Sequence, residues 1–172
     1  REAVDERTGL IVAVTPNNPT GLVAEREAVE AVIEEGGSAL TLIDHAYVEY
    51  ADQDLTSMAI ERDDVVVTRT LSKAWGMAGL RLGFAVAAPE TIDALAAVGN
   101  PYPVSAESIR IATRRLDTGS SEVERHIETV VDERERLGDL LEEYGVETTD
   151  SRANFVYGRF DHPEWVHAAF AG

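Results

Sequence analysis

Residues 10–44, LIVAVTPNNPTGLVAEREAVEAVIEEGGSALTLID, contain the pattern that decides the fold. An apolar, β-branched run at Leu10–Val14 is followed by a turn rich in proline, asparagine and glycine, and then by a helical pattern over 24–35 that ends at two glycines. A second apolar run, 39–43, ends at Asp44. Two short strands joined through a helix predict a parallel pair with a crossover helix.

The same alternation continues after Asp44. Apolar runs at 65–68 and 82–87 predict two more strands, so the first half of the chain is expected to form a mainly parallel α/β sheet. From Pro89 the pattern becomes helical, and Pro89 itself suits the first position of a helix.

The C-terminal part predicts a second, smaller α+β unit. Its long helix is expected to begin at Ser121, with Glu124 completing a capping box, and to stop at Gly145. Beyond that helix the pattern predicts two short strands and a final helix, over 146–149, 154–158 and 163–170.

The composition excludes several classes of partner. The chain has 15 basic and 32 acidic residues and a net charge of -17, which repels nucleic acid and anionic membrane surfaces. This acidic surface suits a high-salt cytoplasm, although GC-rich coding bias explains it equally well. Because no apolar run reaches membrane-spanning length and the first residues do not resemble a signal peptide, we expect a cytoplasmic protein.

Cysteine and histidine usage narrows the chemistry further. The absence of cysteine excludes disulfides, thiolate metal ligands and a cysteine nucleophile. The four histidines do not show zinc-ligand spacing, so we expect no metal site. The four are His45, His126, His162 and His167. We interpret all of them as structural or exposed, and only His45 is a candidate to support the site residues without contacting the ligand.

Lys73 is the only lysine of the chain and lies between a predicted strand and a turn marked by Gly76. All other basic side chains except the histidines are arginines, which cannot condense with an aldehyde, whereas a lysine amine can form an imine. Lys73 therefore points to covalent aldehyde chemistry. The alternative is that Lys73 is a chance survivor of a bias against lysine.

Three polar residues follow the predicted parallel strands at their carboxyl ends, where such sheets bind ligands. They are Asn18, Asp44 and Lys73. An aspartate that closes a buried apolar strand needs a partner for its charge, and a protonated pyridine nitrogen would be such a partner.

The motifs around these residues resemble, in order and spacing, those of the class I/II pyridoxal-phosphate aminotransferases of fold type I. They are the segments 16–21, 44–47, 70–73 and 79–84. Within that family the chain is most similar to the histidinol-phosphate aminotransferase branch. The segments that indicate this branch are 69–73, 78–81 and 151–156.

The resemblance implies pyridoxal 5′-phosphate as cofactor and a role for each matching residue. Lys73 would hold the cofactor aldehyde as an aldimine and later move a proton between the substrate Cα and C4′ of the cofactor. Asp44 would pair with the pyridinium nitrogen. Asn18 and Tyr47 would hydrogen-bond the phenolic oxygen and so lower the pKa of the aldimine.

The phosphate group would be held by Thr70, Ser72 and Arg81, and Arg81 would supply a charge-assisted contact. Each predicted site residue also has an ordinary structural explanation. Asn18 suits a turn, Tyr47 suits core packing, and Arg81 could pair with a carboxylate. Thr70 and Ser72 suit a strand and a turn, while Asp44 could cap a helix near Ala46. The joint occurrence of these residues at family spacing favours one shared site.

By this resemblance, residues 1–118 are part of the cofactor-binding large domain and residues 119–172 are part of the C-terminal small domain. The chain is expected to be a fragment that lacks the N-terminal part and the C-terminal end of a family member. The family's arginine for the substrate carboxylate is not matched by Arg152 or Arg159.

The implied function is transfer of an amino group between an amino acid, or an amino-phosphate such as histidinol phosphate, and a 2-oxo acid through a Lys73 aldimine. One alternative is a pyridoxal-phosphate decarboxylase of the threonine-phosphate type. Another is an incomplete, inactive fragment of such an enzyme. The family also implies a homodimer for the complete protein.

Overall fold

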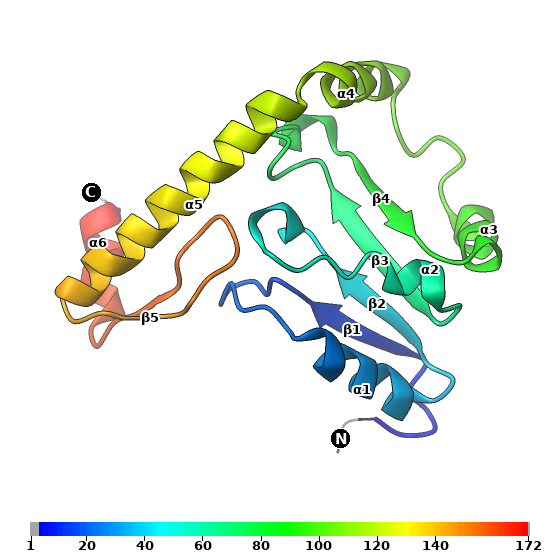
Figure 1. The fold of residues 1–172 in the computed structure, drawn as a ribbon, viewed down its shortest axis with the longest axis horizontal. Coiled ribbons are helices and arrows are strands. Elements are labelled where there is room, and N and C mark those ends of the chain that lie inside the picture. Colours follow the sequence, from blue (N-terminus) through cyan, green and yellow to red (C-terminus); the bar gives the residue numbers. More distant parts are fainter. Residues whose placement is uncertain (1–3, 172) are drawn as a thin grey trace.

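The structure is a computed structural model that describes residues 4–171. In this part of the chain the main sheet consists of β1 (Leu10–Val14), β2 (Leu40–Asp44), β3 (Val65–Thr70) and β4 (Gly83–Val86) (Figure 1). The first three helices are α1 (Arg26–Gly36), α2 (Met58–Glu61) and α3 (Pro89–Val98). Two short 3₁₀ helices, η1 (Val48–Tyr50) and η2 (Ala78–Leu80), follow β2 and β3.

The main sheet is mainly parallel, as the sequence predicts. Its strands lie in the order β1-β2-β3-β4, with β1, β2 and β3 parallel and β4 antiparallel to β3. In Figure 1 the arrows of the three parallel strands point toward the long helix α5 (Ser120–Glu143). The four strands expected from the sequence are confirmed, with ends that differ by one or two residues.

One face of the sheet is covered by α1 and α2, and the main apolar core lies there. Val29 and Ile33 of α1 pack with Ile43 of β2 and with Val65 and Val67 of β3. These side chains alternate along the strands because successive strand residues point to opposite faces. Full burial of each such side chain contributes roughly 1.5–3 kcal/mol.

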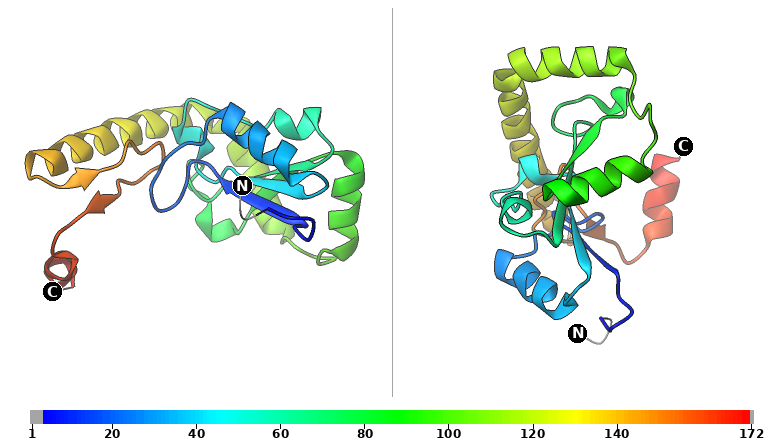
Figure 2. Two further views of the ribbon diagram at one scale, coloured as in Figure 1. Left: turned by 90° about the horizontal axis from the view of Figure 1, so that it is seen from below. Right: turned by 90° about the vertical axis from the view of Figure 1, so that its right-hand side faces the viewer.

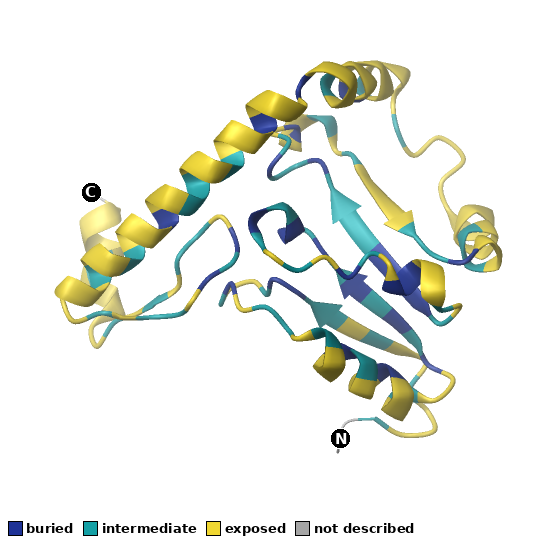
Figure 3. Cartoon of the chain, in the orientation of Figure 1, coloured by how far each residue is buried: buried dark blue, intermediate teal, exposed yellow. Residues whose placement is uncertain are grey.

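Several apolar side chains on the two edge strands are exposed to solvent. Leu10 and Val12 of β1 are 52% and 55% exposed, and Phe84 of β4 is 49% exposed. Figure 3 shows the resulting contrast between the buried centre of the sheet and its outer parts. The sheet of the described residues is therefore sealed on its α1 side and accessible at β1 and β4.

The junction between α4 (Ala106–Thr118) and α5 corrects one expectation. The capping box of Ser121 and Glu124 is wrong, because α5 begins at Ser120 and Gly119 is its N-cap. The Gly119 amide donates to the carbonyl of Arg115, and the Gly119 carbonyl accepts from the amide of Val123. The chain thus passes directly from one helix into the next, which places Ser121 inside the first turn of α5.

The segment after α5 also differs from its expected strands. The end of α5 is confirmed, since Gly145 follows it with a φ of +75°. The only strand pairing in this segment of the described structure joins β5 (Glu147–Thr148) to β6 (Gly158–Arg159). Residues 154–157 of the strand expected over 154–158 are instead irregular, and the chain bends at 153–155, where the Ser151 hydroxyl donates to the Phe155 carbonyl at 2.6 Å.

The final helix, α6 (Pro163–Phe170), is confirmed. Figure 2 shows that α6 and the far end of α5 project away from the main sheet. No helix within residues 4–171 has both the length and the hydrophobicity required to cross a membrane.

Helix α5 packs on the loops that follow the parallel strands. Val123 belongs to a buried cluster with Tyr47, Tyr50, Ala74 and Ala153, and Ile127 and Val130 lie against it. These positions recur at the three- and four-residue spacing of one helix face. The helix therefore holds the region in which the sequence predicts the active site.

Candidate active site

The predicted site residues lie in loops that leave one edge of the sheet. Val14, Asp44 and Thr68 are in register at the carboxyl ends of β1, β2 and β3. Backbone hydrogen bonds continue this alignment beyond β1 and β2. The Thr15 amide donates to the Asp44 carbonyl at 3.0 Å, and the His45 amide donates to the Thr68 carbonyl at 2.9 Å. The carboxyl edge of a parallel sheet is where ligands bind in α/β proteins.

Asn18 and Tyr47 meet at this edge. The Nδ2 atom of Asn18 donates to the Tyr47 hydroxyl at 3.1 Å, although the residues are far apart in sequence. Asn18 itself is exposed, in a turn closed by the 2.6 Å bond from the Gly21 amide to the Asn17 carbonyl. Tyr47 is buried, so its hydroxyl is presented from a fixed ring.

Lys73 lies beside the same tyrosine. Its Nζ atom is 5.1 Å from the centroid of the Tyr47 ring, a distance at which the ring attracts an ammonium group. Lys73 is half-buried, and a turn in which the Gly76 amide donates to the Lys73 carbonyl at 3.0 Å defines its backbone. The structure therefore brings together the amine, the phenol hydroxyl and the Asn18 amide.

Asp44 is half-buried at the end of β2. Its Oδ1 atom accepts a hydrogen bond from the Ala46 amide at 2.9 Å and so stabilises the local turn. The helix-capping role that the sequence left open is not found, because η1 begins at Val48 with Tyr47 as its N-cap and no side-chain cap hydrogen bond. Within residues 4–171 its Oδ2 atom accepts no hydrogen bond. Asp44 can therefore stabilise the local turn and still receive a second donor.

Thr70, Ser72 and Arg81 lie around the loop that joins β3 to β4. The Leu71 amide donates to the Leu82 carbonyl at 3.1 Å and closes the base of this loop. Ser72 and Arg81 are the loop residues next to this bond, one at each end of the loop. The Thr70 hydroxyl is already used, since it donates to the Leu82 carbonyl at 3.3 Å and accepts from the Ser72 amide at 3.1 Å.

Arg81 has an exposed side chain and a left-handed backbone with a φ of +55°. Its Nη1 atom donates to the Ala78 carbonyl at 3.3 Å. No carboxylate of residues 4–171 forms an ion pair with it, which argues against the carboxylate pairing that the sequence left open. The guanidinium charge of Arg81 is therefore available to an anion.

His45 has the supporting position that the sequence allowed for it. It is 1% exposed; its Nδ1 atom contacts the carbonyl of Thr15, and its Nε2 atom accepts from the Leu55 amide at 2.9 Å. Burial lowers the pKa of His45. A neutral imidazole that donates through Nδ1 thus fastens the end of β1 to the loop after Tyr47.

Two residues that contact this site were not predicted. Phe155 packs edge-on against Tyr47, with ring centroids 5.3 Å apart and an interplanar angle of 87°. The buried Arg134 of α5 donates to the carbonyl of Ala153 at 3.1 Å. For Phe155 the sequence signal was its place in the 151–156 motif, which had indicated the family branch but no contact with the site. For Arg134 the signal was its position on the apolar face of α5.

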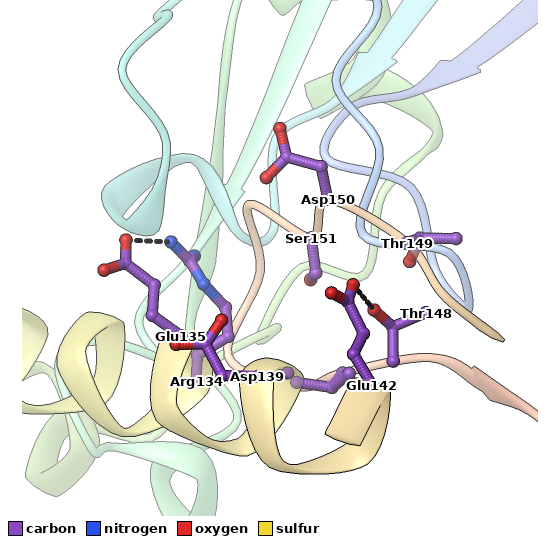
Figure 4. A pocket seen from close by; sticks show the side chains of 10 residues that line it. Arg134, Glu135, Asp139, Glu142, Thr148, Thr149, Asp150 and Ser151 are labelled. Carbon is purple, nitrogen blue, oxygen red and sulfur yellow. Dashed lines mark hydrogen bonds and ion pairs between the residues drawn. The ribbon is translucent and has the colours of Figure 1, made fainter. Parts of the chain in front are cut away.

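A cavity of about 220 Å³ lies between α5 and the segment 148–151 (Figure 4). Its wall includes Arg134 together with four carboxylates, those of Glu135, Asp139, Glu142 and Asp150. None of the predicted site residues lines it. A wall dominated by carboxylates repels a phosphate group, so this cavity is separate from the candidate cofactor site.

Comparison with known proteins agrees with the motifs. The sequence model of the family described as Aminotransferase class I and II matches residues 1–169. An aromatic amino acid aminotransferase of Rhodococcus erythropolis is 39% identical over 158 residues, covering 90% of this chain and 44% of that relative. A histidinol-phosphate aminotransferase of Streptomyces avermitilis is 38% identical over 173 residues, covering 96% of this chain and 47% of that relative.

A solved structure supports the same fold. The histidinol-phosphate aminotransferase of Sinorhizobium meliloti, in complex with pyridoxal-5′-phosphate, matches with a TM-score of 0.78 and 28% identity, over 86% of this chain and 41% of that chain. The expected α/β fold of a fold type I enzyme and the expected family are confirmed. The chain spans about half the length of the curated relatives that it matches.

Proposed function

The chain belongs to the class I and II aminotransferases, and from that premise we propose that its protein transfers an amino group between an amino acid, or an amino-phosphate such as histidinol phosphate, and a 2-oxo acid. Members of this family depend on pyridoxal phosphate, which confirms the expected cofactor at the level of the family. The observation that carries the proposal is the Lys73 amine, 5.1 Å from the ring centroid of Tyr47.

Pyridoxal phosphate, when bound, supplies an aldehyde for a lysine amine and a ring that withdraws electrons from the substrate Cα. Lys73 would hold the cofactor through its amine. Once the substrate amine has displaced it, Lys73 would move a proton between the substrate Cα and C4′ of the cofactor. Arginine cannot take either role because its guanidinium stays protonated.

The donor and acceptor groups at the sheet edge fit this cofactor. Asp44 has one carboxylate oxygen that no described residue engages, as the pairing with a protonated ring nitrogen requires. Asn18 and Tyr47 present an amide and a hydroxyl at the same place, 3.1 Å apart, and both groups can donate a hydrogen bond to a phenolic oxygen.

The phosphate would be held mainly by the Ser72 hydroxyl and the Arg81 guanidinium, since the Thr70 hydroxyl already makes two internal hydrogen bonds. Thr70 would contact the phosphate only after giving up its bond to the Leu82 carbonyl. We therefore propose Ser72 and Arg81 as direct ligands and Thr70 as a weaker one.

Larger-scale features of the protein follow from family membership. We propose that residues 1–118 belong to the large domain and residues 119–172 to the small domain. The complete protein is proposed to be a cytoplasmic homodimer, and an active complete protein that sediments as a monomer would contradict this. Its acidic surface, with a net charge of -17 in this chain, would suit high salt.

Reduction with borohydride tests the role of Lys73 in the full-length protein with bound cofactor. A stable pyridoxyl adduct is expected on the peptide that contains Ser72 and Lys73. The variant Lys73→Arg should lose both the adduct and the visible absorbance of bound cofactor while unfolding at the temperature of the unmodified protein without cofactor. An adduct on a lysine outside this segment, or full activity of Lys73→Arg, would overturn the assignment.

A matched control separates a dedicated site from any accessible lysine. In the double variant Lys73→Arg/Arg159→Lys the new amine occupies an exposed position that is 75% accessible. This variant should form no adduct. Amino-donor-dependent conversion of the cofactor to its amine form would support transamination, whereas release of CO₂ from the substrate would support the decarboxylase alternative.

A further inference from the structure

The segment Thr149–Phe155, here called the support segment, contacts the turn that carries Asn18. The Thr149 hydroxyl donates to the Thr20 carbonyl at 2.5 Å, and the Arg152 amide donates to the Gly21 carbonyl at 2.8 Å. These bonds join parts of the chain that are 129 residues apart at Thr20 and Thr149. The turn of Asn18 is thus fastened on one side to the C-terminal part of the chain.

Gly21 is placed so close to the support segment that no side chain fits there. A Cβ atom at Gly21 would lie 1.9 Å from Oγ and 2.8 Å from Cα of Ser151. Its φ of +73° also favours glycine. Any larger residue at position 21 would therefore push the turn away from Ser151.

The same segment contacts Tyr47, the partner of Asn18. Phe155 lies edge-on to the Tyr47 ring, and Ala153, which is fully buried, belongs to the same apolar cluster. Edge-to-face aromatic pairs stabilise a contact beyond the area that they bury. One short segment therefore contacts both Tyr47 and the turn that carries Asn18, two parts of the site that come from different loops.

The support segment is itself held in one shape. The Ser151 hydroxyl donates to the Phe155 carbonyl at 2.6 Å and accepts from the Ala153 amide at 3.2 Å. Arg134 then fastens the segment to α5, because its Nη1 atom donates to the carbonyls of Ala153 at 3.1 Å and of Tyr50 at 3.5 Å. Figure 4 shows Arg134 of α5 and Ser151 of the support segment among the side chains that line the cavity.

We infer that the support segment sets the position of the Asn18 amide relative to the Tyr47 hydroxyl, and that Gly21, Ser151 and Phe155 are positioning residues of the active site. A single neutral hydrogen bond contributes too little net free energy to fix an exposed turn by itself. The inference rests on the proposed function, in which this pair binds the phenolic oxygen of the cofactor.

The test uses the full-length protein with bound cofactor. The visible absorbance of the cofactor is recorded as a function of pH, and the midpoint is the pH at which its change is half complete. Loss of hydrogen bonds to the phenolic oxygen should move this midpoint to higher pH in Asn18→Ala and in Tyr47→Phe. Gly21→Ala should move it in the same direction, by on the order of 0.5–1 pH unit, the equivalent of one hydrogen bond.

Gly145→Ala is the matched control for Gly21→Ala. Gly145 has a φ of +75°, but a Cβ atom there would meet nothing within 4 Å. Both variants therefore strain the backbone, and only Gly21→Ala displaces the turn. Equal midpoints for the two variants, with Asn18→Ala shifted, would overturn the inference and leave the proposed function intact.

Coupling to the site residues separates positioning from a general loss of stability. Gly21→Ala should add no further shift in an Asn18→Ala background, and Phe155→Leu should add none in a Tyr47→Phe background. Additive shifts would contradict the inference. If Gly21→Ala does not fold, Phe155→Leu alone decides: a midpoint equal to that of the unmodified protein would refute it. Absence of any cofactor absorbance in the unmodified protein would instead count against the proposed function.

Discussion

Arg69 and Glu49 form an ion pair, with 2.9 Å between Nη2 of Arg69 and Oε1 of Glu49, in which the side chains are only 20% and 12% exposed. Arg69 immediately precedes Thr70 on β3, and Glu49 lies in η1, two residues after Tyr47. The pair therefore joins the strand that leads to Lys73 to the segment that presents Tyr47. Arg69 also reaches Asp54, at 3.0 Å.

Removing the charge of Glu49 is expected to destabilise the protein. In Glu49→Gln the Arg69 guanidinium stays largely buried with one fewer anionic partner, so the free energy of unfolding should fall by about 1–3 kcal/mol. The control is Glu61→Gln, which weakens the pair of Arg26 and Glu61 at a position where Glu61 is 54% exposed. Chemical denaturation should show a loss below about 1 kcal/mol for the control, and equal losses would argue against a special role for the Arg69 pair.

The stability of the protein is expected to depend on pH through His45. Burial lowers the pKa of His45 in the folded state, so the unfolded chain binds more protons below the ordinary histidine pKa of about 6.5. The stabilisation from neutral His45 is present above that pH and is lost as the pH falls toward the lower pKa of the folded state. Unfolding free energies at pH 8 and pH 5.5 should therefore differ more in the unmodified protein than in His45→Gln.

The control for this measurement is His126→Gln, at an exposed position on α5. It should retain the pH dependence of the unmodified protein. A His45→Gln variant with the same pH dependence as the unmodified protein would contradict the assignment. At constant pH 8, His45→Ala should also lose about 1–3 kcal/mol, because the Leu55 amide would remain buried without its acceptor.

Arg134 is expected to contribute more to stability than any exposed arginine of α5. Arg134→Ala leaves the Ala153 carbonyl without its donor and opens a gap in the buried contact, so a loss of about 2–4 kcal/mol is expected. Arg136→Ala, two residues away and 78% exposed in its pair with Glu133, should change stability by about 0.5 kcal/mol or less. Thermal unfolding of the two variants side by side provides the measurement.

The charge of Asp44 is expected to serve catalysis rather than folding. Asp44→Asn keeps an oxygen that can accept the Ala46 amide but removes the negative charge needed beside a protonated ring nitrogen. Turnover of the full-length variant should fall by several powers of ten while its unfolding free energy changes by about 1 kcal/mol or less. Near-normal turnover would remove Asp44 from the site.

The sequence by itself determined the parallel sheet and predicted the residues of the candidate site. The apolar runs and the helix between them have periods that depend only on neighbouring residues, so β1, α1 and β2 could be predicted from local pattern. Lys73 was singled out because it is the only lysine of the chain, and the other candidate residues because they occur together at the spacing of family motifs. The parallel topology then places the strand ends at one edge.

Only the tertiary structure decided which of these groups are free to act and what holds them. The Thr70 hydroxyl is used by Leu82, Gly119 takes the place of the expected cap at Ser121, and the chain bends at 153–155 where a strand over 154–158 was expected. Each of these outcomes depends on polar contacts that the hydrophobic pattern does not reveal, whether across the loop from Thr70 to Leu82 or within a few residues, as between Ser151 and Phe155. Such contacts outweigh local propensity because a buried polar group must find its partner wherever the fold provides one.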